Sequence, residues 1–586
     1  MSADLSGGAG GPSALEPLLA AVLAALAEGD GLRGGPLPAG RPQDIAAAVA
    51  EEFAAGAGGA VGSGGGGSGG AMPGTGTGHG TRHGTGTGGP AGSAGAGPGA
   101  AVPGGTSGSP ACAGSGGEGR GEASGTERGE GRTGAPGAHP AYGSTRSSGP
   151  PRDLPLSRLT RLLAAGSADP AHPACAAHLH CPPLAVAVAA DLAVSALNPS
   201  QDSWDQAPAA TVLETLLLGE LAQMAGYDPG SAAGVLTSGG TESNLMGLML
   251  ARDRVLGAVT GRRVEMSGVS GGPRARILAS AAAHFSVQRA AALLGLGEDA
   301  VIPVPVDRNL RMREGELAAL LDRCRHRGQV PVAVVATAGT TDTGAVDPLR
   351  ACAQLAAAHG AWLHVDAAYG GGALLSDRLA PLLDGIGAAD SVSLDWHKLG
   401  WQPAAAGVFL VREAETYASL ARRAVYLNPA DDEEAGYPSL LGLSLRTTRR
   451  ADAFKIAVTL RTLGREGLGR LVDACHELAV AGARTVREHP RLELHAEPVL
   501  TVFLFRYVTE GVEGGAPAVL DRVNASLRRR LLREGRAVVG RTELPGEGPG
   551  RVRLKLTLLN PHTTPAEVER LLHAVVAAGR AEEDLL

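Results

Sequence analysis

The chain has 586 residues, a formal net charge of −7 and a pI near 6.2, with 44% hydrophobic and only 3% aromatic residues. A mildly acidic chain with no long basic run does not indicate a nucleic-acid partner, and no apolar stretch reaches the length of about 20 residues that crosses a membrane. We therefore expect a cytoplasmic protein that binds neither nucleic acid nor membrane.

The N-terminal quarter divides into two unlike parts. Residues 1–53 carry a helical pattern, which is clearest from Leu15 to Leu26. Residues 54–150 consist mostly of Gly, Ser, Thr, Ala and Pro, with few large apolar side chains to offset the entropy of ordering. We predict a helical segment at 1–53 and a disordered insertion at 54–150, whose two histidines, His79 and His83, reflect composition rather than a metal site.

Cysteine and histidine gather once, between His172 and Cys181. The group lacks paired Cys-x-x-Cys spacing, and no second half-site follows it, so we predict no metal there. The six cysteines of the chain show no disulfide spacing and should be reduced thiols.

The segment from 151 to 440 alternates strand and helix signals after a helical part at 151–190. Short apolar runs separated by helices are typical of an α/β domain with a mostly parallel sheet that binds its ligand at the carboxyl ends of the strands. Seven strands are predicted, at 233–237, 276–279, 301–306, 332–336, 362–366, 391–394 and 407–411. The helices are predicted at 211–224, 244–256, 284–294, 314–327 and 348–359.

Residues 441–586 have a different pattern, with longer helices and fewer strands. We predict a smaller α+β domain there. Its helices are predicted at 450–463, 466–488, 517–535 and 565–578, and its strands at 500–507, 537–539 and 552–558.

Lysine is almost absent, because only three of the 52 Lys and Arg residues are lysine: Lys398, Lys455 and Lys555. Arginine supplies positive charge elsewhere, but only lysine can deprotonate and form a Schiff base. Lys398 follows a predicted strand end, and Asp366 ends another strand 32 residues earlier. A Schiff-base lysine and an aspartate for a pyridinium nitrogen are the pair that pyridoxal 5′-phosphate (PLP) needs.

Three further strand ends carry groups that suit the same cofactor. The run Ser-Gly-Gly-Thr-Glu-Ser-Asn at 238–244 joins a strand to a helix start, where glycines and free N–H groups favour a phosphate. His284 could stack on a ring or simply cap a helix, and Thr340 and Thr341 offer hydroxyls to the rim. We predict a PLP site formed by these strand ends.

Five motifs in order resemble the group II PLP-dependent amino-acid decarboxylases, over about residues 155–580. They are Gly-Gly-Thr-Glu-Ser-Asn, Ala-His-Phe-Ser-Val, Thr-Ala-Gly-Thr-Thr-Asp-Thr-Gly, His-Val-Asp-Ala-Ala-Tyr-Gly-Gly and Asp-Trp-His-Lys. The resemblance implies the type I fold of PLP enzymes, α-decarboxylation and a homodimer with its active site at the interface. It also implies that Lys398 binds PLP with His397 beside it, Asp366 pairs with the ring nitrogen, and His284 and Ala368 lie on the two ring faces. Gly239, Gly240 and Thr241 would hold the phosphate, and Thr341 would lie near Asp366.

The proton donor is less well defined by the resemblance. Aromatic decarboxylases deliver the proton from a tyrosine on a mobile loop, which corresponds here to about 426–445. An ungapped alignment places Leu440 at that position, and Tyr437 lies three residues away. We take Tyr437 as the candidate donor.

Within the family, the chain is most similar to the diaminobutyrate decarboxylases. Aromatic decarboxylases have aromatic side chains where this chain has His180 and Asp202. Because an acidic group suits a distal ammonium better than a phenyl ring, we predict a diamino-acid substrate bound by His180 and by Asp202 or Asp205. Both aspartates could instead cap a turn.

Other functions remain open. The substrate could be an aromatic acid, lysine or ornithine, or the fold could support transamination, another lyase reaction or oxidative deamination. A PLP-fold scaffold without activity is a further alternative, but such a protein would typically lack Lys398 or add a DNA-binding motif, and the sequence shows neither.

Overall fold

The computed structural model describes residues 11–40, 44, 47, 50, 154–422, 424–510, 516–546 and 548–586. The insertion predicted at 54–150 lies outside the described residues, as does most of 41–53, so both stay predictions there. Residues 34–40 are described and form bends, so the helical prediction is wrong for them. Among the described helices, none is long and apolar enough to cross a membrane.

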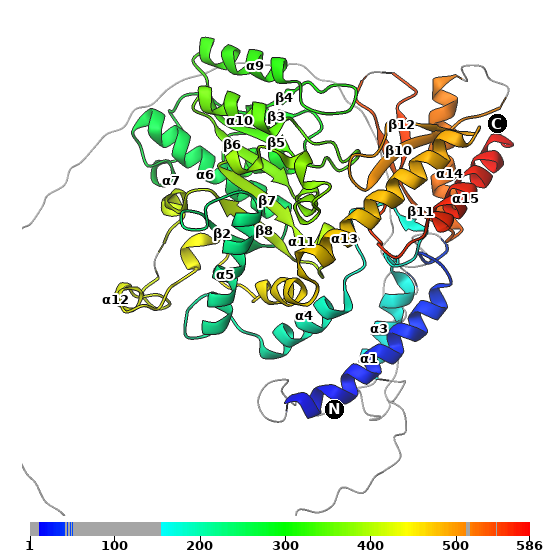
Figure 1. Cartoon of the computed structure of the whole chain (residues 1–586), viewed down its shortest axis with the longest axis horizontal. Coiled ribbons are helices and arrows are strands. Elements are labelled where there is room, and N and C mark those ends of the chain that lie inside the picture. The colour runs from blue at the N-terminus through cyan, green and yellow to red at the C-terminus, as the bar shows by residue number, and fades with distance from the viewer. Residues whose placement is uncertain are drawn as a thin grey trace, which may run out of the picture. The chain divides into compact units, whose positions relative to one another are not determined.

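Two N-terminal helices, α1 (Gly11–Arg33) and α3 (Pro155–Gly166), pack side by side (Figure 1). Arg161 of α3 pairs with Glu28 of α1 at 3.1 Å. The helical prediction is confirmed for these segments and for α4 (Ala185–Leu197), but it is wrong for 167–184, which holds only a two-residue strand, β1 (Cys175–Ala176). Four prolines between Pro170 and Pro183 remove backbone donors that a helix requires.

The large domain contains the predicted seven-stranded sheet, in the order β2-β8-β7-β6-β5-β3-β4. Strand β8 runs antiparallel to both of its neighbours, and the other pairs are parallel. The mostly parallel sheet is therefore confirmed. Its strands are β2 (Ala233–Thr237), β3 (Ala275–Ser280), β4 (Val301–Val304), β5 (Val330–Thr337), β6 (Trp362–Ala367), β7 (Ser391–Asp395) and β8 (Gly407–Val411).

Helices cover both faces of this sheet. Successive side chains of each strand point to opposite faces, and because these strands are apolar throughout, both faces need to be buried. Helices α6 (Gly240–Thr260) and α8 (Ser286–Leu293) pack with Val235, Ile277 and Val335 on one face. The other face packs with α5 (Pro208–Met224), α9 (Glu314–His326) and α10 (Leu349–Ala358). The short helices are α7 (Val264–Ser267), α11 (Trp396–Leu399) and α12 (Ala430–Glu434).

The C-terminal domain is built on a five-stranded sheet in the order β1-β11-β12-β10-β9. Its strand β1 comes from the segment before the large domain and pairs in parallel with β11, which the sequence did not predict. The other strands are β9 (Leu492–Leu494), β10 (Val502–Tyr507), β11 (Val538–Glu543) and β12 (Val552–Thr557). Helices α13 (Ala453–Glu488), α14 (Pro517–Arg533) and α15 (Pro565–Glu583) pack against it.

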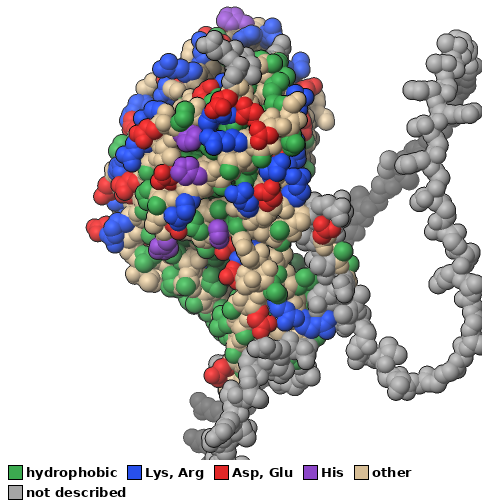
Figure 2. Space-filling view, turned by 90° about the vertical axis from the view of Figure 1, so that its right-hand side faces the viewer, with side chains coloured by type: hydrophobic (Ala, Val, Ile, Leu, Met, Phe, Trp, Pro, Cys, Tyr) green, Lys and Arg blue, Asp and Glu red, His purple; other side chains and the backbone are tan. Residues whose placement is uncertain are grey.

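Helix α13 connects the two domains. Its first half packs in the large-domain core through Ile456 and Leu468, and its second half packs in the C-terminal core through Leu478 and Ala483. The two helices predicted at 450–463 and 466–488 meet at Gly464, where φ is +67°. On the face of the molecule shown in Figure 2, acidic and basic side chains are intermixed rather than gathered by sign.

Candidate active site

A cavity of about 380 Å³ opens at the carboxyl ends of β2, β5, β6 and β7. Parallel strands place their chain ends at one sheet edge, which explains why segments far apart in sequence meet there. The residues that line it are Ser238, Gly239, Gly240, Thr241, Asn244, His284, Thr337, Gly339, Thr341, Asp366, Ala368, Tyr369, Asp395, His397 and Lys398. All nine residues predicted to contact the cofactor are among them.

Lys398 lies on α11, directly after β7, and its Nζ is 2.9 Å from Asp395 Oδ2. Asp395 is 2% exposed at its side chain, and its Oδ1 is buried without a hydrogen-bond partner. The sequence prediction missed Asp395 as a site residue, although it begins the Asp-Trp-His-Lys motif. A buried acidic partner holds the lysine side chain at the cavity wall.

His397 lies between the same aspartate and the backbone of the next strand. Its Nε2 is 3.6 Å from Asp395 Oδ2, and Ala406 N–H donates to its Nδ1 at 3.3 Å. Burial lowers the pKa of His397, so the ring is held neutral as an acceptor for that backbone N–H.

Asp366 is the second-to-last residue of β6, and its carboxylate lines the cavity from a buried position. Its Oδ1 accepts the Ala368 N–H at 3.1 Å, and its Oδ2 accepts the Asn244 side-chain N–H at 2.8 Å. A carboxylate fixed by donors alone is suited to face a protonated ring nitrogen.

His284 follows β3 and has its Nδ1 2.9 Å from Ser286 Oγ. Burial lowers the pKa of His284 more than Asp366 raises it, so a neutral imidazole faces the cavity. A neutral ring can stack on another planar ring, which agrees with the role that the resemblance implied.

The loop before α6 fits a phosphate. Gly240 begins this 21-residue helix, and a Cβ there would lie 2.8 Å from the Ala368 Cβ. A Cβ on Gly239, where φ is +150°, would lie 3.1 Å from His397 Cε1. Side chains at these two positions would fill the gap that an anion needs at the helix start. The backbone N–H groups at the start of α6, the space beside Gly239 and Gly240, and the Lys398 amine together fit a phosphorylated planar aldehyde.

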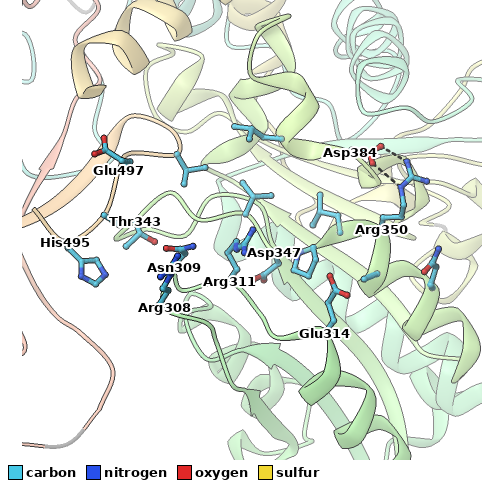
Figure 3. Close-up of a pocket in the computed structure, with 18 residues that line it drawn as sticks. Arg308, Asn309, Arg311, Glu314, Thr343, Asp347, Arg350, Asp384, His495 and Glu497 are labelled. Atoms are coloured by element: carbon cyan, nitrogen blue, oxygen red, sulfur yellow. Dashed lines mark hydrogen bonds and ion pairs between the residues drawn. The ribbon is translucent and has the colours of Figure 1, made fainter. Parts of the chain in front are cut away.

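A larger cleft of about 1010 Å³ lies between the loops after β4 and β5 and the segment 495–499 (Figure 3). Three of its charged side chains have partners within the cleft or in the backbone. Arg350 pairs with Asp384 at 2.6 Å, and the buried Asp347 accepts the Met312 and Thr337 N–H groups. No lysine lines this cleft, so the chemistry predicted from the sequence belongs to the smaller cavity.

Four predicted residues, His180, Asp202, Asp205 and Tyr437, do not line the cavity. Tyr437 packs edge-on against Trp204 with ring centroids 6.3 Å apart, and Asn428 of the same loop donates to Asp202 O at 3.1 Å. Asp205 accepts from Ser203 Oγ at 2.5 Å, a bond between two side chains of one short turn. Contacts between the segments 202–205 and 428–437 therefore hold Asp202 and Tyr437, and neither lines the cavity that contains Lys398.

The other two lysines are held in ion pairs. Lys455 is fully buried, 3.0 Å from Asp191 and 3.1 Å from Asp452. Lys555 pairs with Asp342 at 2.8 Å, and its Nζ donates to Thr341 O at 3.4 Å. Lys455 therefore ties α4 to α13, and Lys555 ties β12 to the loop that carries Thr341.

Comparison with known proteins gives a consistent picture. A model described as the pyridoxal-dependent decarboxylase conserved domain matches residues 156–508. An L-2,4-diaminobutyrate decarboxylase from Rhizobium meliloti is 45% identical over 412 residues, which cover 70% of this chain and 79% of the relative. The enzyme of that name from Acinetobacter baumannii is 38% identical over 440 residues, covering 74% and 84%.

Solved structures share the fold. The glutamate decarboxylase domain of a diaminobutyrate-pyruvate transaminase and L-2,4-diaminobutyrate decarboxylase from Vibrio parahaemolyticus is 35% identical, with a TM-score of 0.64, and the match covers 73% of this chain and 86% of that one. An Oryza sativa TDC solved with PLP and tryptamine is 27% identical, with a TM-score of 0.68 and coverage of 75% and 90%.

Proposed function

We propose that this chain, which belongs to the family of pyridoxal-dependent decarboxylases, removes CO2 from a diamino acid such as L-2,4-diaminobutyrate and leaves the corresponding diamine. Family membership makes the chain a PLP-dependent carboxy-lyase. The observation that carries the proposal is the placement of Lys398 and Asp366 in one cavity beside a glycine-rich helix start.

The roles of the cavity residues follow from their positions. Bound PLP supplies an electron-withdrawing ring, which makes loss of the substrate carboxylate possible. Asp366 would hold a proton on the ring nitrogen, and Lys398 would form the covalent bond to the cofactor. Gly239, Gly240 and Thr241 would hold the phosphate, His284 and Ala368 would contact the ring, and Thr341 and His397 would border the site.

A second copy of the chain completes the site. Helices α1, α3, α4 and α5 expose large apolar side chains, and such surfaces typically mark interfaces. Asp202 and Tyr437 lie outside the cavity of their own chain, so a homodimer can bring them to the cavity of the partner. The exposed residues are Leu23, Leu26, Leu32, Leu159, Leu163, Val188, Leu192, Leu197, Val212 and Leu216.

In this arrangement each group from the second copy has a defined task. The Asp202 carboxylate, whose Oδ1 is buried without a partner, binds the distal ammonium of the substrate. His180 would supply a further polar contact to the substrate. Tyr437, whose side chain is half exposed, moves with its loop and delivers a proton to Cα after CO2 leaves.

Free thiols agree with a cytoplasmic location. All five described cysteines, from Cys175 to Cys475, are unpaired. Reduced cysteines are typical of proteins of the cytosol, and we place the enzyme there.

The reaction is tested by CO2 release from the purified protein with PLP. The substrates to compare are diaminobutyrate, ornithine, lysine, glutamate, aspartate, tyrosine and DOPA. Preferential turnover of diaminobutyrate supports the proposal. Preference for an aromatic acid would keep the decarboxylase and refute the diamino substrate, and bound PLP without CO2 from any substrate would point to another PLP reaction.

Replacing Asp202 by alanine should lower kcat/KM for diaminobutyrate by about 10- to 100-fold, because the distal ammonium loses its carboxylate. Steady-state CO2 release with diaminobutyrate and with its uncharged analogue 2-aminobutyrate separates ammonium recognition from a general loss. Asp205→Ala is the matched control, since its carboxylate is occupied by Ser203. A change of less than a few-fold for diaminobutyrate would contradict the role of Asp202.

Mixing two inactive variants should restore activity if the site is shared between copies. Tyr437→Phe should itself lose about 100-fold in kcat. Subunit exchange of Lys398→Ala with Tyr437→Phe gives heterodimers with one intact site, so about a quarter of the wild-type activity should return. No recovery, with heterodimers verified by differently tagged chains, would place Tyr437 and Lys398 of one chain in the same site.

A further inference from the structure

A network of buried polar side chains leads from Asn244, at the cavity beside Asp366, into the core of the sheet. Its members are Asn244 of α6, Trp362 and His364 of β6, and Ser391 and Ser393 of β7. Each is between 0% and 3% exposed. Burying five polar side chains in a sheet core is unfavourable unless each one finds its partners.

The hydrogen bonds of this network share one donor-to-acceptor direction, from Trp362 toward Asp366. Trp362 Nε1 can only donate, and it lies 2.8 Å from Ser391 Oγ. Because the Ser391 oxygen accepts this bond, its hydroxyl can donate to His364 Nδ1, 2.9 Å away. His364 Nε2, 2.9 Å from Asn244 Oδ1, must then carry the proton and donate.

Burial agrees with this tautomer. It lowers the pKa of His364 to about 4, so the ring is neutral near pH 7. The imidazole packs closely against α6 at Gly247, where a Cβ would lie 2.6 Å from His364 Nδ1. The absence of a side chain at Gly247 therefore leaves room for the imidazole between α6 and the sheet.

Asn244 is the junction between this network and the cavity. Its Oδ1 accepts from His364 and from Ser393 Oγ at 3.0 Å, which leaves its two N–H groups to face the cavity side. One donates to Asp366 Oδ2 at 2.8 Å, and the other to Ser286 Oγ at 2.9 Å. Ser286 in turn contacts His284 Nδ1, so one amide orients both residues that would flank the cofactor ring.

We propose that Asn244 and His364 are positioning residues whose one-way hydrogen bonds keep Asp366 oriented as an acceptor for the ring nitrogen. Reversing the direction of these hydrogen bonds is unfavourable, because the Asn244 oxygen would then face a carboxylate and Trp362 cannot accept. This inference rests on the proposed function, because it needs PLP in the cavity with its nitrogen toward Asp366. The sequence pattern placed Asn244 in the phosphate loop, whereas this inference assigns it a role at the ring nitrogen.

The test compares two ligands in the apo protein, PLP and its 1-deaza analogue, in which carbon replaces the ring nitrogen. Fluorescence titration gives Kd for both. The wild-type protein should prefer PLP by about tenfold or more, since only PLP offers an N–H to Asp366. Asn244→Ala and His364→Leu should lose most of that preference, and His364→Gln should keep it, because the glutamine amide can still donate to Asn244 Oδ1.

A matched control separates positioning from folding. His476 is a buried histidine of α13 that bonds Leu500 O at 2.7 Å, outside the cavity. His476→Leu should lower thermal stability without changing the ligand preference. If His364→Leu does not fold, Ser391→Ala breaks the same network one link earlier and should weaken the preference about threefold.

Each outcome has one meaning. Failure of the wild-type protein to bind either ligand would overturn the proposed function. An unchanged preference for PLP in folded Asn244→Ala and Ser391→Ala, with normal binding by the wild type, would refute the positioning role alone. Loss of preference in His364→Leu with recovery in His364→Gln would support it.

Discussion

Lys398→Ala should release no measurable CO2, with a loss of at least about 10³-fold, and should lack the absorbance of covalently bound PLP. The Lys398 amine lies in the cavity 2.9 Å from a buried carboxylate, and neither of the other two lysines lines that cavity. No other amine of the described chain can take its place there.

Lys398→Arg distinguishes the nucleophile from its charge. Arginine keeps a cation within reach of Asp395 but cannot deprotonate to form the covalent bond. The arginine variant should therefore fold like the wild type, as judged by its melting temperature, and be as inactive as alanine. If it retained a tenth of the wild-type CO2 release, the covalent role of Lys398 would be wrong.

Asp366→Asn should lower kcat by about 100-fold or more, because the ring nitrogen loses the negative charge that keeps it protonated. The amide has the same shape as the carboxylate, so the cavity should keep its form. Its carbonyl oxygen would also compete for the Asn244 amide. Stopped CO2-release assays at saturating substrate measure this effect apart from binding.

Asp390→Asn is the control for a carboxylate in the same sheet. Asp390 precedes β7 at the opposite end from the cavity, where it accepts the Leu363 N–H at 2.7 Å and pairs with Arg412 at 2.8 Å. This variant should melt at a lower temperature but keep its kcat. A kcat for Asp366→Asn within threefold of wild type would contradict the proposed pairing with the ring.

Much of the architecture could be predicted because the strands are buried on both faces. Runs such as Val332 to Ala336 are continuously apolar, and burial at this depth leaves few alternatives to a central strand. The cofactor contacts were equally accessible, since each lies at a strand end and the ends of parallel strands converge. His284, Asp366 and Lys398 all lie at the cavity for this reason.

The parts that escaped prediction depend on pairing across long distances. Strand β1 has two residues and no periodicity, and it exists only because β11 offers an open edge more than 350 residues later. The role of His364 carries no local signal either, because a polar residue inside an apolar strand does not reveal its partner. The places of Asp202 and Tyr437 depend on loops, where sequence spacing does not fix geometry.

The scarcity of lysine has a chemical consequence for the folded enzyme. The side chains of Lys398, Lys455 and Lys555 are 20%, 0% and 10% exposed, respectively. Apart from the terminal amine, the chain thus offers acylating reagents, amine cross-linkers and lysine-directed proteases almost nothing to attack. Reagents that would label many lysines on an ordinary protein surface have one main target here, the Lys398 amine in the cavity, and they compete with the cofactor for it.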